Sequence, residues 1–176
     1  MTLQLLKPER ALVTGGDPDA PADIPSGAFF EDNDNPDFLP AFEPTVIAGK
    51  LIETCPELKH LREMSVTVLW KRKGGASAGK YTLGTCRRAS GLVRHFSKTD
   101  FIVTLSADHL YVFKFTNWQL EALIYHELLH TYVEDEKAST VGHDCEMFFD
   151  EVRRYGVWRM DLEGAAKVFK QVELPL

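Results

Sequence analysis

A strongly signalled helix begins at Thr116 and carries two histidines one turn apart. The Thr116 hydroxyl can cap the first turn while Gln119 reaches back to the cap residue, which is the pattern of a capping box. Phe115 and Leu120 have the spacing of a hydrophobic staple. The pattern therefore predicts an amphipathic helix that runs to about Glu134.

The two histidines belong to the sequence His126-Glu127-Leu128-Leu129-His130 within this helix. Side chains four residues apart lie on one helix face, so two imidazoles can bind the same zinc ion, at nitrogen–metal distances of about 2.0–2.1 Å. Glu127 points beside such a metal and can take a proton from its bound water. The alternative is an ordinary core helix with two surface histidines.

A catalytic zinc site usually takes three protein ligands and a water, so a third ligand must come from another segment. His143 is the leading candidate, because Gly142 permits a sharp entry into the next predicted helix and the linker after His130 is long enough to fold back. Three further residues remain candidates: Glu146, Cys145 and His109. Asp144 can cap that next helix or orient a ligand.

The other elements are predicted to be short. Helices are expected over residues 45–55, 144–155 and 161–171, and strands over 65–70, 81–85 and 101–105. Residues 74–79 predict a glycine-rich turn that leads from the first strand to a return strand. The polar residues 135–142 are expected to form a linker.

Charge divides the chain into three zones that add to the net charge of −6. Residues 1–49 carry 2 basic and 9 acidic side chains, residues 50–100 carry 11 and 4, and residues 101–176 carry 7 and 13. Seven of the nine prolines lie in the first 44 residues, which disfavours helix and central strand there. We therefore expect residues 1–43 to be an extended or partly docked acidic segment, and residues 44–176 to be one domain. Four phenylalanines indicate that part of the acidic segment lies against the body: Phe29, Phe30, Phe38 and Phe42.

Composition excludes several classes of protein. A chain that is 44% hydrophobic is neither wholly disordered nor collagen-like. No apolar run approaches the roughly 20 residues of a membrane span, and the first ten residues show no secretory signal. Three scattered cysteines do not form a disulfide framework. We expect a cytoplasmic protein with no membrane partner.

Basic side chains gather around the predicted strands 65–70 and 81–85. The residues in question are Lys71, Arg72, Lys73, Arg87 and Arg88. Such a group can bind nucleic-acid phosphates or the acidic segment 1–43, and the simplest alternative is a solvated surface.

Three segments resemble known families: Phe101-Ile102-Val103, the sequence ALIYHELLH over 122–130, and GHDCEMFFDEVRRYGVW over 142–158. The general pattern is similar to SprT-like and Spartan-like zinc metalloproteases, and the closer match is the putative phage metallopeptidase family. The resemblance covers about residues 44–170. The acidic segment lies outside it, and the paired cysteines of a zinc ribbon are missing.

The resemblance implies a zincin-like α+β fold, in which a small, mostly antiparallel sheet packs on the helix that carries the H-E-x-x-H motif. The following helix would supply the third ligand. It implies a zinc metallopeptidase with Glu127 as general base, His126, His130 and His143 as ligands, and a protein or peptide as substrate. By the same analogy, residues 101–105 would be the edge strand that pairs with substrate. Candidates for the oxyanion-stabilising residue are Tyr111, Tyr132, Tyr155 and Arg87. A non-catalytic, zinc-stabilised phage protein that binds a host protein or nucleic acid is the alternative, and the infected bacterial cytoplasm is the expected location.

Overall fold

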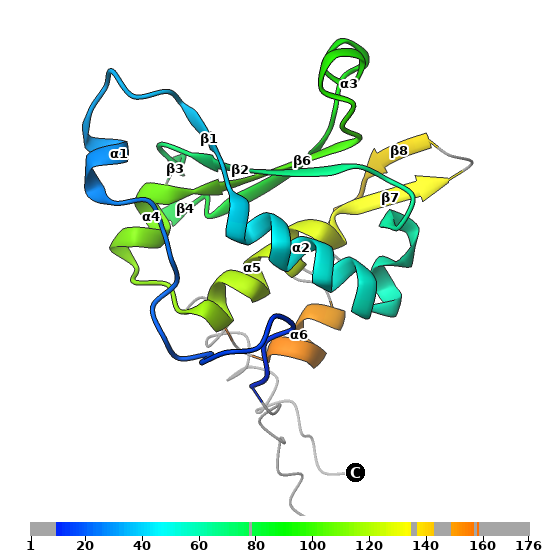
Figure 1. Cartoon of the computed structure of the whole chain (residues 1–176), viewed down its shortest axis with the longest axis horizontal. Coiled ribbons are helices and arrows are strands. Elements are labelled where there is room, and N and C mark those ends of the chain that lie inside the picture. The colour runs from blue at the N-terminus through cyan, green and yellow to red at the C-terminus, as the bar shows by residue number, and fades with distance from the viewer. Residues whose placement is uncertain (1–9, 78, 135–136, 143–148, 157, 159–176) are drawn as a thin grey trace, which may run out of the picture.

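The computed structural model describes residues 10–77, 79–134, 137–142, 149–156 and 158. Figure 1 shows a sheet with helices α2, α5 and α6 on one side of it. The described helices are α1 (Gly27–Glu31), α2 (Phe42–Thr54), the 3-10 helix η1 (Pro56–Leu61), α3 (Gly91–Ser97), α4 (Ala107–Val112), α5 (Asn117–Leu129) and α6 (Phe149–Tyr155). The described strands are β1 (Phe38–Pro40), β2 (Val66–Lys71), β3 (Ala76–Ser77), β4 (Lys80–Tyr81), β5 (Gly84–Arg88), β6 (Phe101–Ser106), β7 (Thr131–Glu134) and β8 (Lys137–Thr140).

The main sheet has four strands in the order β1-β2-β6-β5. The central pair β2 and β6 is parallel, and the flanking strands β1 and β5 are antiparallel to their neighbours. The α+β class is confirmed, with a mixed sheet. The expected return from strand 65–70 directly to strand 81–85 is wrong, because β6 lies between them. Phe101, Val103 and Leu105 of β6 are fully buried, which explains why this strand takes an interior place.

The position of β6 also corrects the expected substrate-binding edge. Residues 101–105 pair with neighbours on both sides, and β5 is the edge strand on this side of the sheet. Backbone groups along a strand pair laterally, so only an edge strand can accept an added chain.

Helix α5 begins where the sequence predicts and ends before the predicted residue Glu134. The Thr116 side chain accepts from the Gln119 N–H, and the Gln119 side chain accepts from the Thr116 N–H, which completes the capping box. The helix ends at Leu129 with His130 as its C-cap, although the sequence pattern extends to Glu134. Residues 131–134 instead pair as β7 with β8, so the predicted linker contains a strand. Their β-branched and aromatic side chains favour strand over helix.

The segment before α2 makes several contacts with the body. The Asn117 and Trp118 N–H groups of the first turn of α5 donate to the carbonyls of Ala20 and Pro18 at 2.9 and 3.0 Å. Phe29 is buried, whereas Phe38 and Phe42 are exposed. These contacts satisfy helix N–H groups that have no partner within the helix. The division of the chain at residue 43 stays a prediction.

The later helices are described in part. Helix α6 ends at Tyr155, the predicted end of the helix over 144–155, and Gly156 follows with a φ of 64°, the left-handed conformation that ends many helices. The start of the helix expected over 144–155 and the whole helix expected over 161–171 lie outside the described residues.

Candidate metal centre

The last turn of α5 brings the two histidines together. The ring centroids of His126 and His130 are 5.1 Å apart, with the rings nearly perpendicular. His126 and Glu127 are buried, and His130 is half-buried at the helix end. This arrangement follows from the four-residue spacing, which places both rings over the same face of the helix.

The His126 ring is held by a buried carboxylate of α6. Glu151 Oε2 lies 2.7 Å from His126 Nδ1, and the Trp158 indole N–H donates to Glu151 Oε1 at 2.6 Å. The Glu151 side chain has no exposed surface. An ionised carboxylate only accepts, so this contact places a proton on Nδ1 of His126 and leaves Nε2 as the ring atom that can bind a metal. This is the tautomer and orientation that a carboxylate gives to a metal-binding imidazole.

The His130 ring is held in the same sense by a backbone carbonyl. His130 Nδ1 donates to the Val141 carbonyl at 2.8 Å, and the Val141 N–H donates to the His130 carbonyl at 2.8 Å. Val141 follows β8 directly, so the β7–β8 hairpin fixes this ring. Burial lowers the pKa of His130, and the neighbouring His126 adds to that effect. A lowered pKa favours the neutral imidazole, which is the form that binds metals.

Glu127 lies against the edge strand β5. A Cβ atom added to Gly84 would be 2.6 Å from Glu127 Oε1, so a glycine there gives the carboxylate its place. Cys86 is two residues along the same strand, and burial together with the negative charge of Glu127 raises the pKa of its thiol to about 12. Without a metal beside it, Cys86 is therefore a thiol.

These side chains form the floor of a cavity of about 350 Å³. One wall is the chain from Tyr81 through β5, and the other is the end of β8. The lining residues are Tyr81, Thr82, Leu83, Gly84, Thr85, Cys86, Leu123, His126, Glu127, His130, Thr140 and Val141. Among these lining residues, Glu127 has the one carboxyl group, and none has a side-chain amine. The cavity therefore places a single negative charge beside two imidazoles.

The donor chemistry suits a metal ion. Two imidazoles, each with Nδ1 against an acceptor, can supply two ligands through Nε2, and a third must come from elsewhere. Within the described ranges, no group of three histidine, cysteine or acidic side chains is placed to hold a metal. The predicted ligand His143, its alternatives Cys145 and Glu146, and Asp144 lie outside the described residues.

His109 was the fourth candidate for the third ligand, and its ring lies elsewhere. His109 Nδ1 contacts the Thr82 carbonyl at 2.9 Å, and the ring packs against Tyr81 and Phe113. It is not among the described residues that line the cavity.

None of the four residues predicted to stabilise an oxyanion lines the cavity among the described residues. Tyr111 packs against Phe30, and the buried Tyr155 hydroxyl donates to Glu121 at 3.1 Å. Tyr132 is exposed on β7, and Arg87 is exposed on β5. The tyrosine on the cavity wall is Tyr81, whose place depends on the β3–β4 turn and could not be read from spacing.

The basic residues do not form one patch on a hairpin. Lys71 and Arg88 are aligned with Ser106 and Phe101, at opposite ends of β6, about 17 Å apart at the usual rise of a strand. Arg72, flanked by Lys71 and Lys73, forms an ion pair with Asp37 of the acidic segment at 3.1 Å. Arg88 donates to the Ala138 carbonyl.

An α+β domain with two helix-borne imidazoles and a carboxylate in one open cavity fits the class of metal-dependent peptidases. A family model named putative phage metallopeptidase matches residues 36–172, so the chain belongs to that family. No curated protein and no solved structure matches it. Membership in this family implies a metal cofactor and a protein or peptide substrate. In the described part of the chain, no helix combines the length and apolar character needed to cross a bilayer.

Proposed function

We propose that the chain is a zincin-type, zinc-dependent metallopeptidase in which His126, His130 and His143 hold the metal and Glu127 is the general base. The observation that carries the proposal is the acceptor that faces Nδ1 of each described histidine at 2.7–2.8 Å, which leaves Nε2 of both rings as the atom that can bind a metal. A core helix without a metal has no need for two oriented imidazoles beside a carboxylate at the floor of one cavity. The same residues support a relationship to SprT-like enzymes.

In the proposed reaction, the metal and the protein side chains have different roles. Bound zinc would supply Lewis acidity, polarising the scissile carbonyl and lowering the pKa of water to about 7. Glu127 takes the proton of the attacking water and delivers it to the leaving amine. Gly84 lets that carboxylate approach the edge strand, and the outer edge of β5, which pairs with no other strand among the described residues, would accept an extended substrate beside it.

The test is Glu127→Gln, which keeps the shape of the side chain and removes its basicity. We expect about one zinc per chain in both proteins and a loss of peptide hydrolysis of about 10²-fold or more in the variant. Glu134→Gln, on the exposed end of β7, is the matched control and should behave as the wild type. Metal content by atomic emission and cleavage of unfolded casein are the two measurements.

Ligand variants separate binding from catalysis. His126→Ala and His143→Ala should lose zinc, whereas His95→Ala on exposed α3 should retain it. Undiminished hydrolysis by Glu127→Gln would refute the mechanism. A wild type that binds zinc and cleaves neither casein nor a peptide library would instead favour the non-catalytic, zinc-stabilised binding protein.

A further inference from the structure

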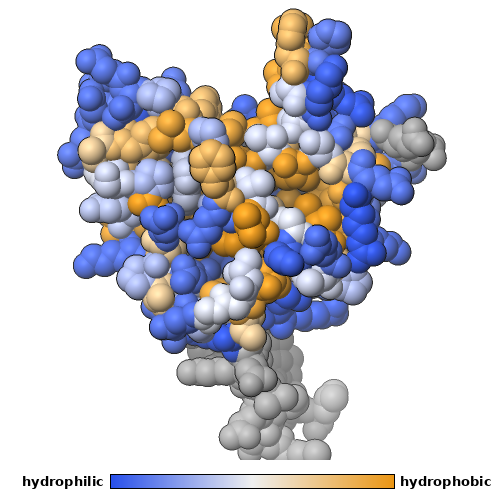
Figure 2. All heavy atoms as spheres, in the orientation of Figure 1, coloured by the Kyte–Doolittle hydropathy of each residue, from blue (hydrophilic) through white to orange (hydrophobic). Residues whose placement is uncertain are grey.

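Helix α3 projects from the sheet and leaves its apolar side chains bare. Figure 1 shows it rising at the top of the molecule, and Figure 2 shows hydrophobic surface at its tip. Leu92 and Phe96, one turn apart, are 71% and 77% exposed, and the helix has no buried residue. Large contiguous apolar patches on a surface mark interaction sites, and these two side chains supply part of such a patch.

The base of this projection is firmly attached. Ser90 caps the helix by accepting from the Val93 N–H, and Arg94 forms an ion pair with Asp100 at 2.7 Å. The other oxygen of Asp100 accepts from the Ser65 N–H at 2.9 Å, which ties the projection to the start of β2. These contacts attach the base of the helix to the sheet.

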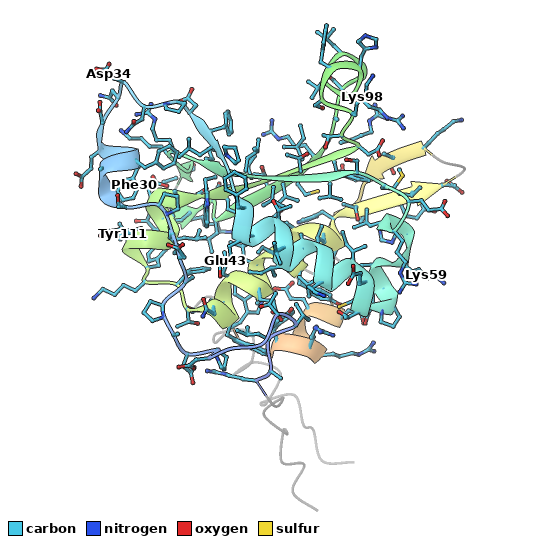
Figure 3. All side chains as sticks on the ribbon, viewed as in Figure 1. Phe30, Asp34, Glu43, Lys59, Lys98 and Tyr111 are labelled. Carbon is cyan, nitrogen blue, oxygen red and sulfur yellow. The ribbon has the colours of Figure 1, made fainter. Side chains whose placement is uncertain are left out.

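Two projections of opposite charge stand on the same side of the sheet. Residues 87–98, here the basic finger, contain Arg87, Arg88, Arg94 and Lys98 and no carboxylate. Residues 31–37, here the acidic prong, contain Glu31, Asp32, Asp34 and Asp37; Arg72 pairs with Asp37, and the other three carboxylates keep the prong negative. Figure 3 shows Asp34 and Lys98 on these two projections, both away from α2 and α5.

The surface between the projections is the outer face of the sheet. Side chains alternate along a strand, so the buried Val68 and Val103 face the helices, and Leu69, Ile102 and Arg87 face outward. Leu69 and Ile102 are partly exposed and Arg87 is exposed, and Figure 2 shows a hollow between the acidic prong and the basic finger. Phe38, 47% exposed, adds apolar surface beside β2.

We propose that this face is a two-fold interface between two copies of the chain. A two-fold axis lying across the hollow, at right angles to the line that joins the projections, sets the basic finger of each copy over the acidic prong of the other. The surface is then complementary to itself, as an isologous interface requires. An anionic membrane or a nucleic acid that covered the same face would meet the acidic prong as well as the basic finger, so the charges disfavour both.

The test reverses charges that have no ion-pair partner within the described ranges, namely Arg87 and Lys98 on the finger and Glu31 and Asp34 on the prong. We expect the full-length wild type to dimerise in sedimentation equilibrium at low salt and to dissociate as salt increases. Arg87→Glu/Lys98→Glu and Glu31→Lys/Asp34→Lys should each raise the dimer Kd about tenfold or more. Mixing the two variants should restore the dimer, because both contacts again join opposite charges.

Two controls keep the outcome clear. Lys59→Glu reverses an exposed charge on η1, away from the hollow, and should leave the dimer intact. Leu92→Ser/Phe96→Ser should weaken the dimer without changing the melting temperature of the monomer.

A wild type that is monomeric at low salt overturns the proposal, and so does a dimer that all charge reversals leave unchanged. A monomer whose basic finger binds a DNA duplex or anionic vesicles assigns the surface to another partner and also overturns it.

Discussion

Replacing Glu151 by glutamine tests whether this buried side chain orients His126 for metal binding. The carboxylate lies between the Trp158 indole N–H and His126 Nδ1, at 2.6 and 2.7 Å. The two groups contact different oxygens of the carboxylate, and a glutamine in the same position has an accepting oxygen at only one of these places. If that oxygen stays with Trp158, the amide N–H₂ faces His126 and favours the tautomer with its proton on Nε2, so that Nε2 cannot bind a metal.

The expected loss of zinc affinity in Glu151→Gln follows from the kind of hydrogen bond that is lost. A hydrogen bond to a charged group is worth about 1.5–3 kcal/mol, which corresponds to roughly 10- to 100-fold in an equilibrium constant. The same range describes the loss of a carboxylate behind a metal-binding histidine, so zinc affinity should fall by about 10- to 100-fold. Competition with a chromophoric chelator measures that affinity directly, without reference to activity.

The control for this prediction is on the same helix. Asp150→Asn removes a neighbouring carboxylate whose ion pair with Arg153 is exposed, and it should leave zinc affinity unchanged. The thermal melt of each metal-free protein separates a loss of folding from a loss of affinity. A Glu151→Gln protein that is folded and binds zinc as tightly as the wild type would refute the orienting role.

Two other changes test the site and its support. Gly84→Ala places a methyl group 2.6 Å from Glu127 Oε1, so the carboxylate must move and hydrolysis should fall by about 10²-fold with zinc content unchanged. Gly49→Ala, where the methyl group meets nothing within 4 Å, is its control, and equal activity of the two variants would contradict the reasoning. Removal of residues 1–22 deletes five hydrogen bonds to the body, among them the carbonyls that accept from the first turn of α5 and the Val13 N–H that donates to Glu121. At about 1 kcal/mol per hydrogen bond, urea unfolding should show a loss of about 5 kcal/mol, and an unchanged midpoint would argue against docking.

Local sequence signals were reliable where neighbouring residues decide the structure. The capping box at Thr116, the end of α2 before Pro56 and the glycine stop at Gly156 each depend on residues within one or two turns. The end of α5 was predicted too late, because the pairing of β7 with β8 decides it and the helical pattern continues past that point.

Contacts between segments far apart in the sequence could not be predicted from local patterns. Nothing in the spacing of strands 65–70, 81–85 and 101–105 shows which of them is central, since all three have strand-like composition. Glu151 was missed for a related reason. It stands among charged residues on α6, and only the packing of that helix against α5 buries it beside His126. A carboxylate on the same helix face as Tyr155 is the signal that could have drawn attention to it.

The sequence by itself determined the helix that carries His126, Glu127 and His130, and their common face, because helical geometry fixes the relation of residues four apart. The tertiary structure alone decided which strand edge borders Glu127, which groups hold the two imidazoles, and where the basic residues lie. Those relations join segments separated by tens of residues, and the register of the sheet and the burial of apolar side chains select them over the alternatives that the same local patterns allow.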